Sequence, residues 1–136
     1  MIVAAACAAC LTLSGEADLR PTRRAVQQIA ASLPFDGKQV ADITLAVAEA
    51  CVNGVRHGAA PGDDPLVTVL AHPADDHLSI EVVDRGIGFH IRPMEMPDAF
   101  SESGRGIALM HALMDQVAIT SSRGGTRVRM IKYFNR

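Results

Sequence analysis

The sequence predicts an α+β fold: a two-layer sandwich in which helices cover one face of a single sheet, mainly antiparallel or mixed. Two observations carry this prediction. Segments with helical apolar spacing occupy residues 18–57, and two pairs of short alternating segments follow at 66–83 and 117–133. Helices beside a run of antiparallel strands are typical of this class. The length of 136 residues favours a single domain spanning residues 1–136.

The first 57 residues are predicted to form one strand and two helices. Residues 9–14 alternate as a strand. Asp18 is a candidate N-cap for a helix that continues to about Leu33. A second helix is expected from about Lys38 to His57, because apolar residues recur there on one side at helical spacing.

The remaining residues are predicted to form four strands, one helix and a lid. The strands are expected at 66–71, 78–83, 117–121 and 126–133, each pair joined by a turn rich in helix and strand breakers. Gly106 to Met114 is predicted to be a helix. Residues 90–103 contain two prolines and no clean periodicity, and a stretch of that length suggests a lid over a site.

Composition narrows the function class and the compartment. Net charge is −2, so the chain lacks the basic excess expected of a protein that contacts nucleic acid directly. Three scattered cysteines are an odd number and fit reduced thiols, which predicts a cytoplasmic location. The apolar start has no basic region before it and is too short to span a bilayer, so we expect no membrane association.

Glu49, Asn53 and His57 stand four residues apart and therefore share one face of the second predicted helix. The Asn53 amide oxygen is a hard ligand that Mg²⁺ accepts beside phosphate oxygens, and Glu49 is a candidate general base. Simpler alternatives are a backbone hydrogen bond for Asn53 and a salt bridge from Glu49 to Arg56. His57, beside Gly58, also fits a cation at the helix C-terminus.

Two glycine-punctuated segments follow this helix. In the first, Asp84 is followed by Gly86 and Gly88, which allow sharp turns or close approach of the backbone to a ligand. A carboxylate at this strand end can accept a hydrogen bond from the exocyclic amine of adenine. Taken alone, this pattern also occurs in many hairpins.

The second segment, Gly104-Arg105-Gly106, is predicted to open a helix. Exposed N–H groups at a helix N-terminus bind anions, and an arginine fork adds a fixed charge for phosphate oxygens. The alternative is a flexible loop before an amphipathic helix. Thr126 either places a hydroxyl near a base or starts the last strand. Together, the three segments indicate a nucleotide site built around a helix.

Arg20, Arg23 and Arg24 crowd the first turn of the first predicted helix. Neighbouring like charges usually form a solvated face. They also fit a contact surface for an acidic protein partner.

The three segments, in this order, resemble the N, G1 and G2 boxes of the GHKL ATPase superfamily, which shares the Bergerat ATP-binding fold. Within it, the chain looks most similar to the small bacterial anti-sigma factor serine kinases. The resemblance covers about residues 11–133. The N box of that family reads Glu, three residues, Asn, then His-Gly, and these positions are filled by Glu49, Asn53, His57 and Gly58.

The resemblance implies a role for each matched residue. Glu49 is similar to the catalytic base that activates a substrate serine, and Asn53 to the Mg²⁺ ligand. Residues 90–103 resemble the ATP lid. The implied nucleotide-binding residues are Asn53, His57, Asp84, Gly86, Gly88, Gly104, Arg105, Gly106 and Thr126. Gly54, Ala108 and His111 depart from the family pattern, where larger or more apolar residues are common.

The resemblance also implies a function. We expect an ATP- and Mg²⁺-dependent protein serine kinase that phosphorylates an anti-anti-sigma (STAS-type) partner and sequesters a sigma factor, acting as a homodimer. An alternative is a module that only binds proteins, with or without ATP, and uses the arginine cluster as its contact face. A freestanding ATPase domain serving another signalling protein is a third reading.

Overall fold

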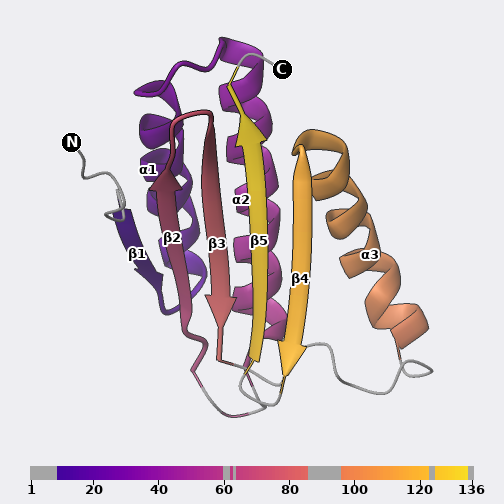
Figure 1. Cartoon of the computed structure of the whole chain (residues 1–136). Coiled ribbons are helices and arrows are strands. Elements are labelled where there is room, and N and C mark those ends of the chain that lie inside the picture. Colours follow the sequence, from indigo (N-terminus) through magenta and orange to yellow (C-terminus); the bar gives the residue numbers. More distant parts are fainter. Residues whose placement is uncertain (1–8, 60–61, 63, 86–95, 123–124, 135–136) are drawn as a thin grey trace.

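The computed structural model describes residues 9–59, 62, 64–85, 96–122 and 125–134. Five antiparallel strands form one sheet in the order β1-β2-β3-β5-β4, and helices pack against it (Figure 1). This arrangement confirms the predicted α+β sandwich. The elements are β1 Ala9–Leu13, η1 Glu16–Asp18, α1 Leu19–Ala31, α2 Gly37–His57, β2 Val67–Pro73, β3 His77–Asp84, α3 Met96–Leu113, β4 Gln116–Ser122 and β5 Gly125–Tyr133.

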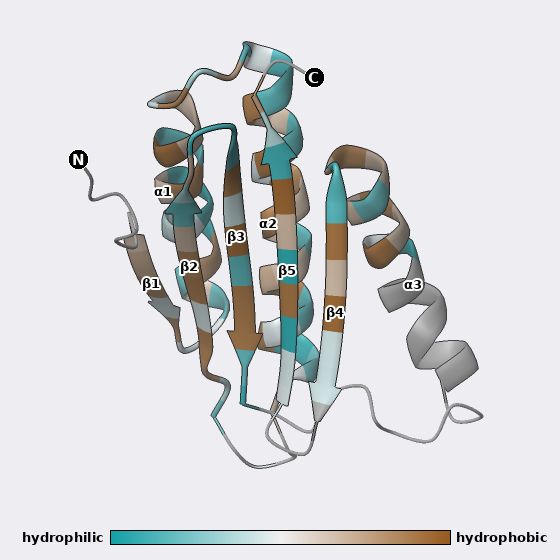
Figure 2. Ribbon diagram, in the orientation of Figure 1, coloured by the Kyte–Doolittle hydropathy of each residue, from teal (hydrophilic) through white to brown (hydrophobic). Residues whose placement is uncertain are grey.

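The core lies between the sheet and α2, and it is aliphatic. Alternate strand residues are buried, such as Val67 and Val69 on β2 and Ile80 and Val82 on β3. Figure 2 shows the corresponding alternation of hydrophobic and hydrophilic bands along β3 and β5. Because successive strand residues point to opposite faces, this alternation places the buried hydrophobic side chains of β2, β3 and β5 on the face that carries the helices.

The opposite face of the sheet is not covered by any helix in the described part of the chain (Figure 1). It carries Glu81 and Arg127, which form an ion pair, together with the half-buried Val83. Among the described helices, none combines the length and hydropathy needed to cross a bilayer.

The helix α1 begins where it was predicted, directly after Asp18, but the Asp18 side chain does not cap it. Its carboxylate accepts hydrogen bonds from the backbone N–H of Ser14 at 2.8 Å and from the Ser14 hydroxyl at 3.2 Å. Asp18 therefore ties the short η1 turn back to the end of β1 instead of satisfying a free N–H of α1.

The helix α2 starts with a complete capping box. Asp36 accepts a hydrogen bond from the backbone N–H of Gln39, and the Gln39 side chain accepts one from the backbone N–H of Asp36. Two free donors of the first turn are satisfied in this way. Near the other end, a Cβ added to Gly54 would lie 2.9 Å from a methyl carbon of Val67. The small residue at position 54 thus lets α2 pack closely on β2.

The helix α3 differs from the sequence prediction. It begins at Met96, ten residues before the expected Gly106, and ends at Leu113. Pro97 lies in its first turn, where proline is tolerated, and the glycines at 104 and 106 are accommodated inside the helix. Of the predicted lid at 90–103, residues 90–95 lie outside the described residues and residues 96–103 are helical.

Candidate nucleotide site

A cavity of about 420 Å³ opens between α2 and α3. Glu49, Asn53 and His57 line it from α2, and Arg105 and Gly106 line it from α3. Glu49 and Asn53 are half-buried, whereas His57 and Arg105 are exposed. Two predicted segments that are about fifty residues apart in sequence are therefore brought together around one polar cavity.

Gly106 makes the closest approach across this cavity. A Cβ added there would lie 3.2 Å from Glu49 Oε2 and 3.4 Å from Asn53 Nδ2. Any side chain at position 106 would occupy the space in front of the carboxylate and the carboxamide. Glycine at this point on α3 keeps both groups accessible to a ligand.

Asp84 and Thr126 are adjacent at the end of the sheet. They are cross-strand partners on β3 and β5, and the Thr126 backbone N–H donates to Asp84 Oδ1 at 3.2 Å. Both residues are buried. The two residues therefore lie side by side, and this hydrogen bond orients the Asp84 carboxylate at the strand end.

Two glycines also pack against Asp84, at the end of β3. A Cβ on Gly58 would lie 2.8 Å from Asp84 Cγ, and Gly125, with φ 131°, packs against the Asp84 backbone. Because Gly58 directly follows His57, the C-terminal end of α2 connects the polar cavity to Asp84. The site therefore runs along one side of α2, from Glu49 to Asp84.

One part of the predicted site is arranged differently from the prediction, and another part lies outside the described residues. Gly104, Arg105 and Gly106 do not open a helix, because α3 already starts at Met96. Inside a helix their backbone N–H groups face carbonyl groups one turn earlier, which corrects the predicted anion-binding helix start. Gly86 and Gly88 lie outside the described residues, so the predicted roles of these two glycines stay predictions.

Arg56 is a cavity residue that the sequence reasoning did not assign to the site. It is exposed, and its Nε lies 3.2 Å from Oε1 of Glu16. Arg56 therefore pairs with η1 and not with Glu49, the partner considered from the sequence. Its position seven residues after Glu49 is the signal that could have placed it on the same face.

A separate groove of about 240 Å³ lies between α1 and α2. Its walls include the apolar Val26 and Val47, and Arg20 and Arg23 stand on its α1 side. Cys51 also lines it, and burial raises the pKa of this thiol to about 12. At neutral pH Cys51 is therefore a protonated, unreactive core residue.

Comparisons with known proteins agree with this geometry. Residues 13–132 match the histidine kinase-like ATPase domain family. The chain is 33% identical to the serine-protein kinase RsbW of Bacillus licheniformis over 124 residues, which is 84% of this chain and 77% of the relative. It is 32% identical to the anti-sigma F factor of Clostridium botulinum over 120 residues, covering 83% and 84% of the two chains.

Among solved structures, the chain resembles the RsbU and RsbW domains of Rv1364c from Mycobacterium tuberculosis, with a TM-score of 0.66 and 23% identity. The match covers 91% of this chain but only 31% of that longer protein, and it supports the fold. Together with the sequence relatives, the matched family identifies the chain: it belongs to the histidine kinase-like ATPases, beside the RsbW serine-protein kinases and anti-sigma F factors.

Proposed function

We propose that this protein is an ATP- and Mg²⁺-dependent protein serine kinase that also sequesters a sigma factor. The observation that carries the proposal is the open space that Gly106 leaves in front of Glu49 and Asn53. A carboxylate, a carboxamide and an exposed arginine converge there on a polar cavity. The names of the relatives, a serine-protein kinase and an anti-sigma factor, support the same activity.

The donor set fits a nucleotide with its metal ion. The Asn53 amide oxygen would hold Mg²⁺, which neutralises charge on the phosphate oxygens when it is bound. Arg105 would add a guanidinium fork for the phosphate groups. Asp84, fixed by the Thr126 N–H, would accept a hydrogen bond from the exocyclic amine of adenine. His57, between these two ends, supports the site from the last turn of α2.

Glu49 would act as the base in the transfer step. Its carboxylate accepts the proton of the substrate serine hydroxyl as the serine oxygen forms a bond to the γ-phosphorus. The bond from that phosphorus to the bridging oxygen breaks, and the products are phosphoserine and ADP. The half-buried position of Glu49 keeps the base close to the cavity while leaving it accessible to a protein substrate.

The substrate would be a serine of an anti-anti-sigma (STAS-type) factor, and phosphorylation would decide which partner is held. The Arg20, Arg23 and Arg24 cluster beside the apolar groove would bind an acidic segment of the sigma factor. The exposed guanidinium groups supply charge complementarity, and the groove supplies apolar area. A protein with such partners would act in the cytoplasm, and the resemblance also implies a homodimer.

Glu49→Gln tests the assigned base. We expect this variant to bind MgATP as tightly as the wild type but to lose phosphate transfer by about 10²-fold or more, because glutamine cannot accept the proton. Calorimetry measures the binding, and radiolabel transfer from ATP to a purified anti-anti-sigma partner measures the reaction. The same assay with excess EDTA should also show no transfer. Normal transfer by Glu49→Gln would refute the base assignment.

A second candidate function is a protein-binding module without kinase activity. The apolar groove between α1 and α2, with Arg20 and Arg23 beside it, favours this function, because partner binding there needs no nucleotide. An assay of the wild-type protein distinguishes the two candidate functions. A binding module binds its partner but leaves the partner's serine unmodified when MgATP is present, whereas a kinase phosphorylates that serine.

A further inference from the structure

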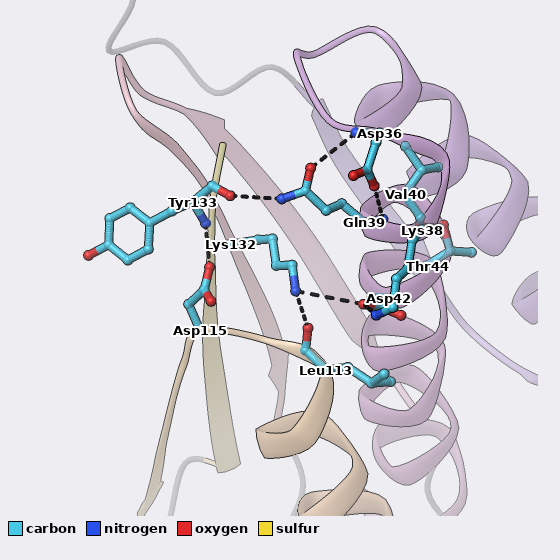
Figure 3. A network of polar contacts seen from close by, with 10 residues as sticks. All are labelled: Asp36, Lys38, Gln39, Val40, Asp42, Thr44, Leu113, Asp115, Lys132 and Tyr133. Atoms are coloured by element: carbon cyan, nitrogen blue, oxygen red, sulfur yellow. Dashed lines mark hydrogen bonds and ion pairs between the residues drawn. The ribbon is translucent and has the colours of Figure 1, made fainter. Parts of the chain in front are cut away.

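The C-terminal end of α3 is attached to three consecutive residues of β5, Ile131, Lys132 and Tyr133. Figure 3 shows the contacts of Lys132 and Tyr133. The backbone N–H of Asp115, just after the helix, donates to the carbonyl oxygen of Ile131 at 2.9 Å. The Asp115 carboxylate accepts from the backbone N–H of Tyr133 at 2.7 Å, and Lys132 Nζ donates to the carbonyl oxygen of Leu113 at 2.5 Å. This end of α3 is therefore fixed to the sheet by polar contacts.

Lys132 is the member of this group that also reaches α2. Its side chain is buried, and its Nζ lies 3.8 Å from a carboxylate oxygen of Asp42 (Figure 3). The ammonium group stands at the C-terminus of α3, where a cation interacts favourably with the free carbonyl groups of a helix end. One side chain thus joins the end of α3, the strand β5 and the second turn of α2.

The spacing along the two helices links this contact to the site. Asp42 and Glu49 are seven residues apart on α2, and Leu113 and Gly106 are seven residues apart on α3. Seven residues are two helical turns, or about 10 Å. The Lys132 contact and the Glu49–Gly106 approach therefore lie two turns apart on the same pair of packed helices.

We propose that Lys132 is a positioning residue for the nucleotide site. By fixing the C-terminal end of α3 to α2 and β5, it sets how closely Gly106 and Arg105 approach Glu49 and Asn53. This inference rests on the proposed nucleotide site. Burying an ammonium group is costly, and apolar residues of similar size often replace buried ion pairs without loss of stability. The need to hold α3 in a fixed position would explain why a buried lysine occupies position 132.

Lys132→Met tests the inference, since it keeps most of the side-chain volume and removes the charge. Lys38→Met is a matched control, because Lys38 pairs with the same Asp42 carboxylate but is exposed on the surface. Asp42→Asn is the second variant, and it weakens the contact without a change of shape. MgATP affinity is measured by calorimetry, and amide hydrogen exchange in residues 105–113 is measured without nucleotide.

We expect Lys132→Met to weaken MgATP binding about fivefold and to accelerate exchange in α3 but not in α1. Asp42→Asn should show smaller changes of the same kind, Lys132→Arg should recover affinity, and Lys38→Met should behave like the wild type. A Lys132→Met variant with lower thermal stability but unchanged affinity and α3 exchange overturns the inference. A wild type that does not bind MgATP instead refutes the proposed function, and the exchange measurement still tests the contact.

Discussion

At the scale of single residues, the site depends on glycines that leave room for polar groups. Gly106 stands opposite Glu49 and Asn53, and Gly58 packs against Asp84. The two positions differ in kind. A Cβ at 58 would meet the Gly54 carbonyl oxygen and Asp84, which cannot move freely, whereas a Cβ at 106 would meet the flexible ends of two side chains. Substitution at 106 therefore perturbs the site without breaking the fold.

Gly106→Ala should separate stability from ligand binding. Alanine is favoured over glycine inside a helix by about 1 kcal/mol, so the variant should be at least as stable as the wild type. Its methyl group would lie 3.2 Å from Glu49 Oε2, and we expect weaker MgATP binding. Thermal unfolding and calorimetry measure the two effects. Unchanged ATP affinity would show that the nucleotide does not approach this part of α3.

Asp84→Asn addresses the base end of the site. An amide retains an oxygen that can accept from the Thr126 N–H, so the fold should persist. It removes the negative charge that favours the exocyclic amine of adenine over the carbonyl of guanine. We expect the preference for ATP over GTP to fall, as measured by competition between the two nucleotides. An unaltered preference would count against the Asp84 contact.

At the scale of secondary-structure elements, the two long N-terminal helices begin differently. The α2 N-terminus has reciprocal bonds between Asp36 and Gln39, whereas the acid at the start of α1, Asp18, bonds to Ser14 outside the helix. Since α2 carries Glu49, Asn53 and the hydrophobic side that covers the sheet, its cap matters for the whole domain.

Asp36→Ala should destabilise the protein by about 1 kcal/mol, the usual cost of losing an N-cap side chain. Gln39, which also donates to the Tyr133 carbonyl oxygen at 3.3 Å, keeps that contact in the variant. Asp18→Ala is the comparison, and we expect a smaller effect because no N–H of α1 loses its partner. Denaturant titration measures both, and equal effects would contradict the assigned cap.

Local periodicity explains which elements could be predicted. The strands and α2 follow apolar spacings that can be recognised in the sequence. A separation of four residues places Glu49 and Asn53 on one face of the helix. The start of α3 could not be predicted from the sequence, because Gly104, Gly106 and the neighbouring polar residues lower the helix propensity of that segment. The pairing of Asp84 with Thr126 depends on strand register across 42 residues, which no local pattern specifies.

At the scale of the whole molecule, one face of the sheet is left without helices in the part that the structure describes (Figure 1). Leu70, Val83 and Ile131 are half-buried residues of this face. Two copies packed through such faces would remove this apolar surface from water. The proposed homodimer is thus compatible with the fold.

Val83→Glu tests that assembly. If the sheet faces meet, the wild type should sediment at twice the 14.4 kDa chain mass and the variant as a monomer, because burying an added carboxylate between the two faces is costly. Ala74→Glu, in the exposed turn between β2 and β3, should sediment with the same mass as the wild-type assembly. A monomeric wild type at high concentration would exclude the homodimer.

The place of β5 between β3 and β4 has a consequence for biosynthesis. During translation, Asp84 leaves the ribosome well before Thr126, so the growing chain lacks the N–H that orients this carboxylate until β5 emerges. A nascent polypeptide halted before residue 125 should therefore fail to retain nucleotide, although it already contains Glu49 and Asn53. Competence for ATP would therefore be acquired only after β5 has emerged and paired with β3.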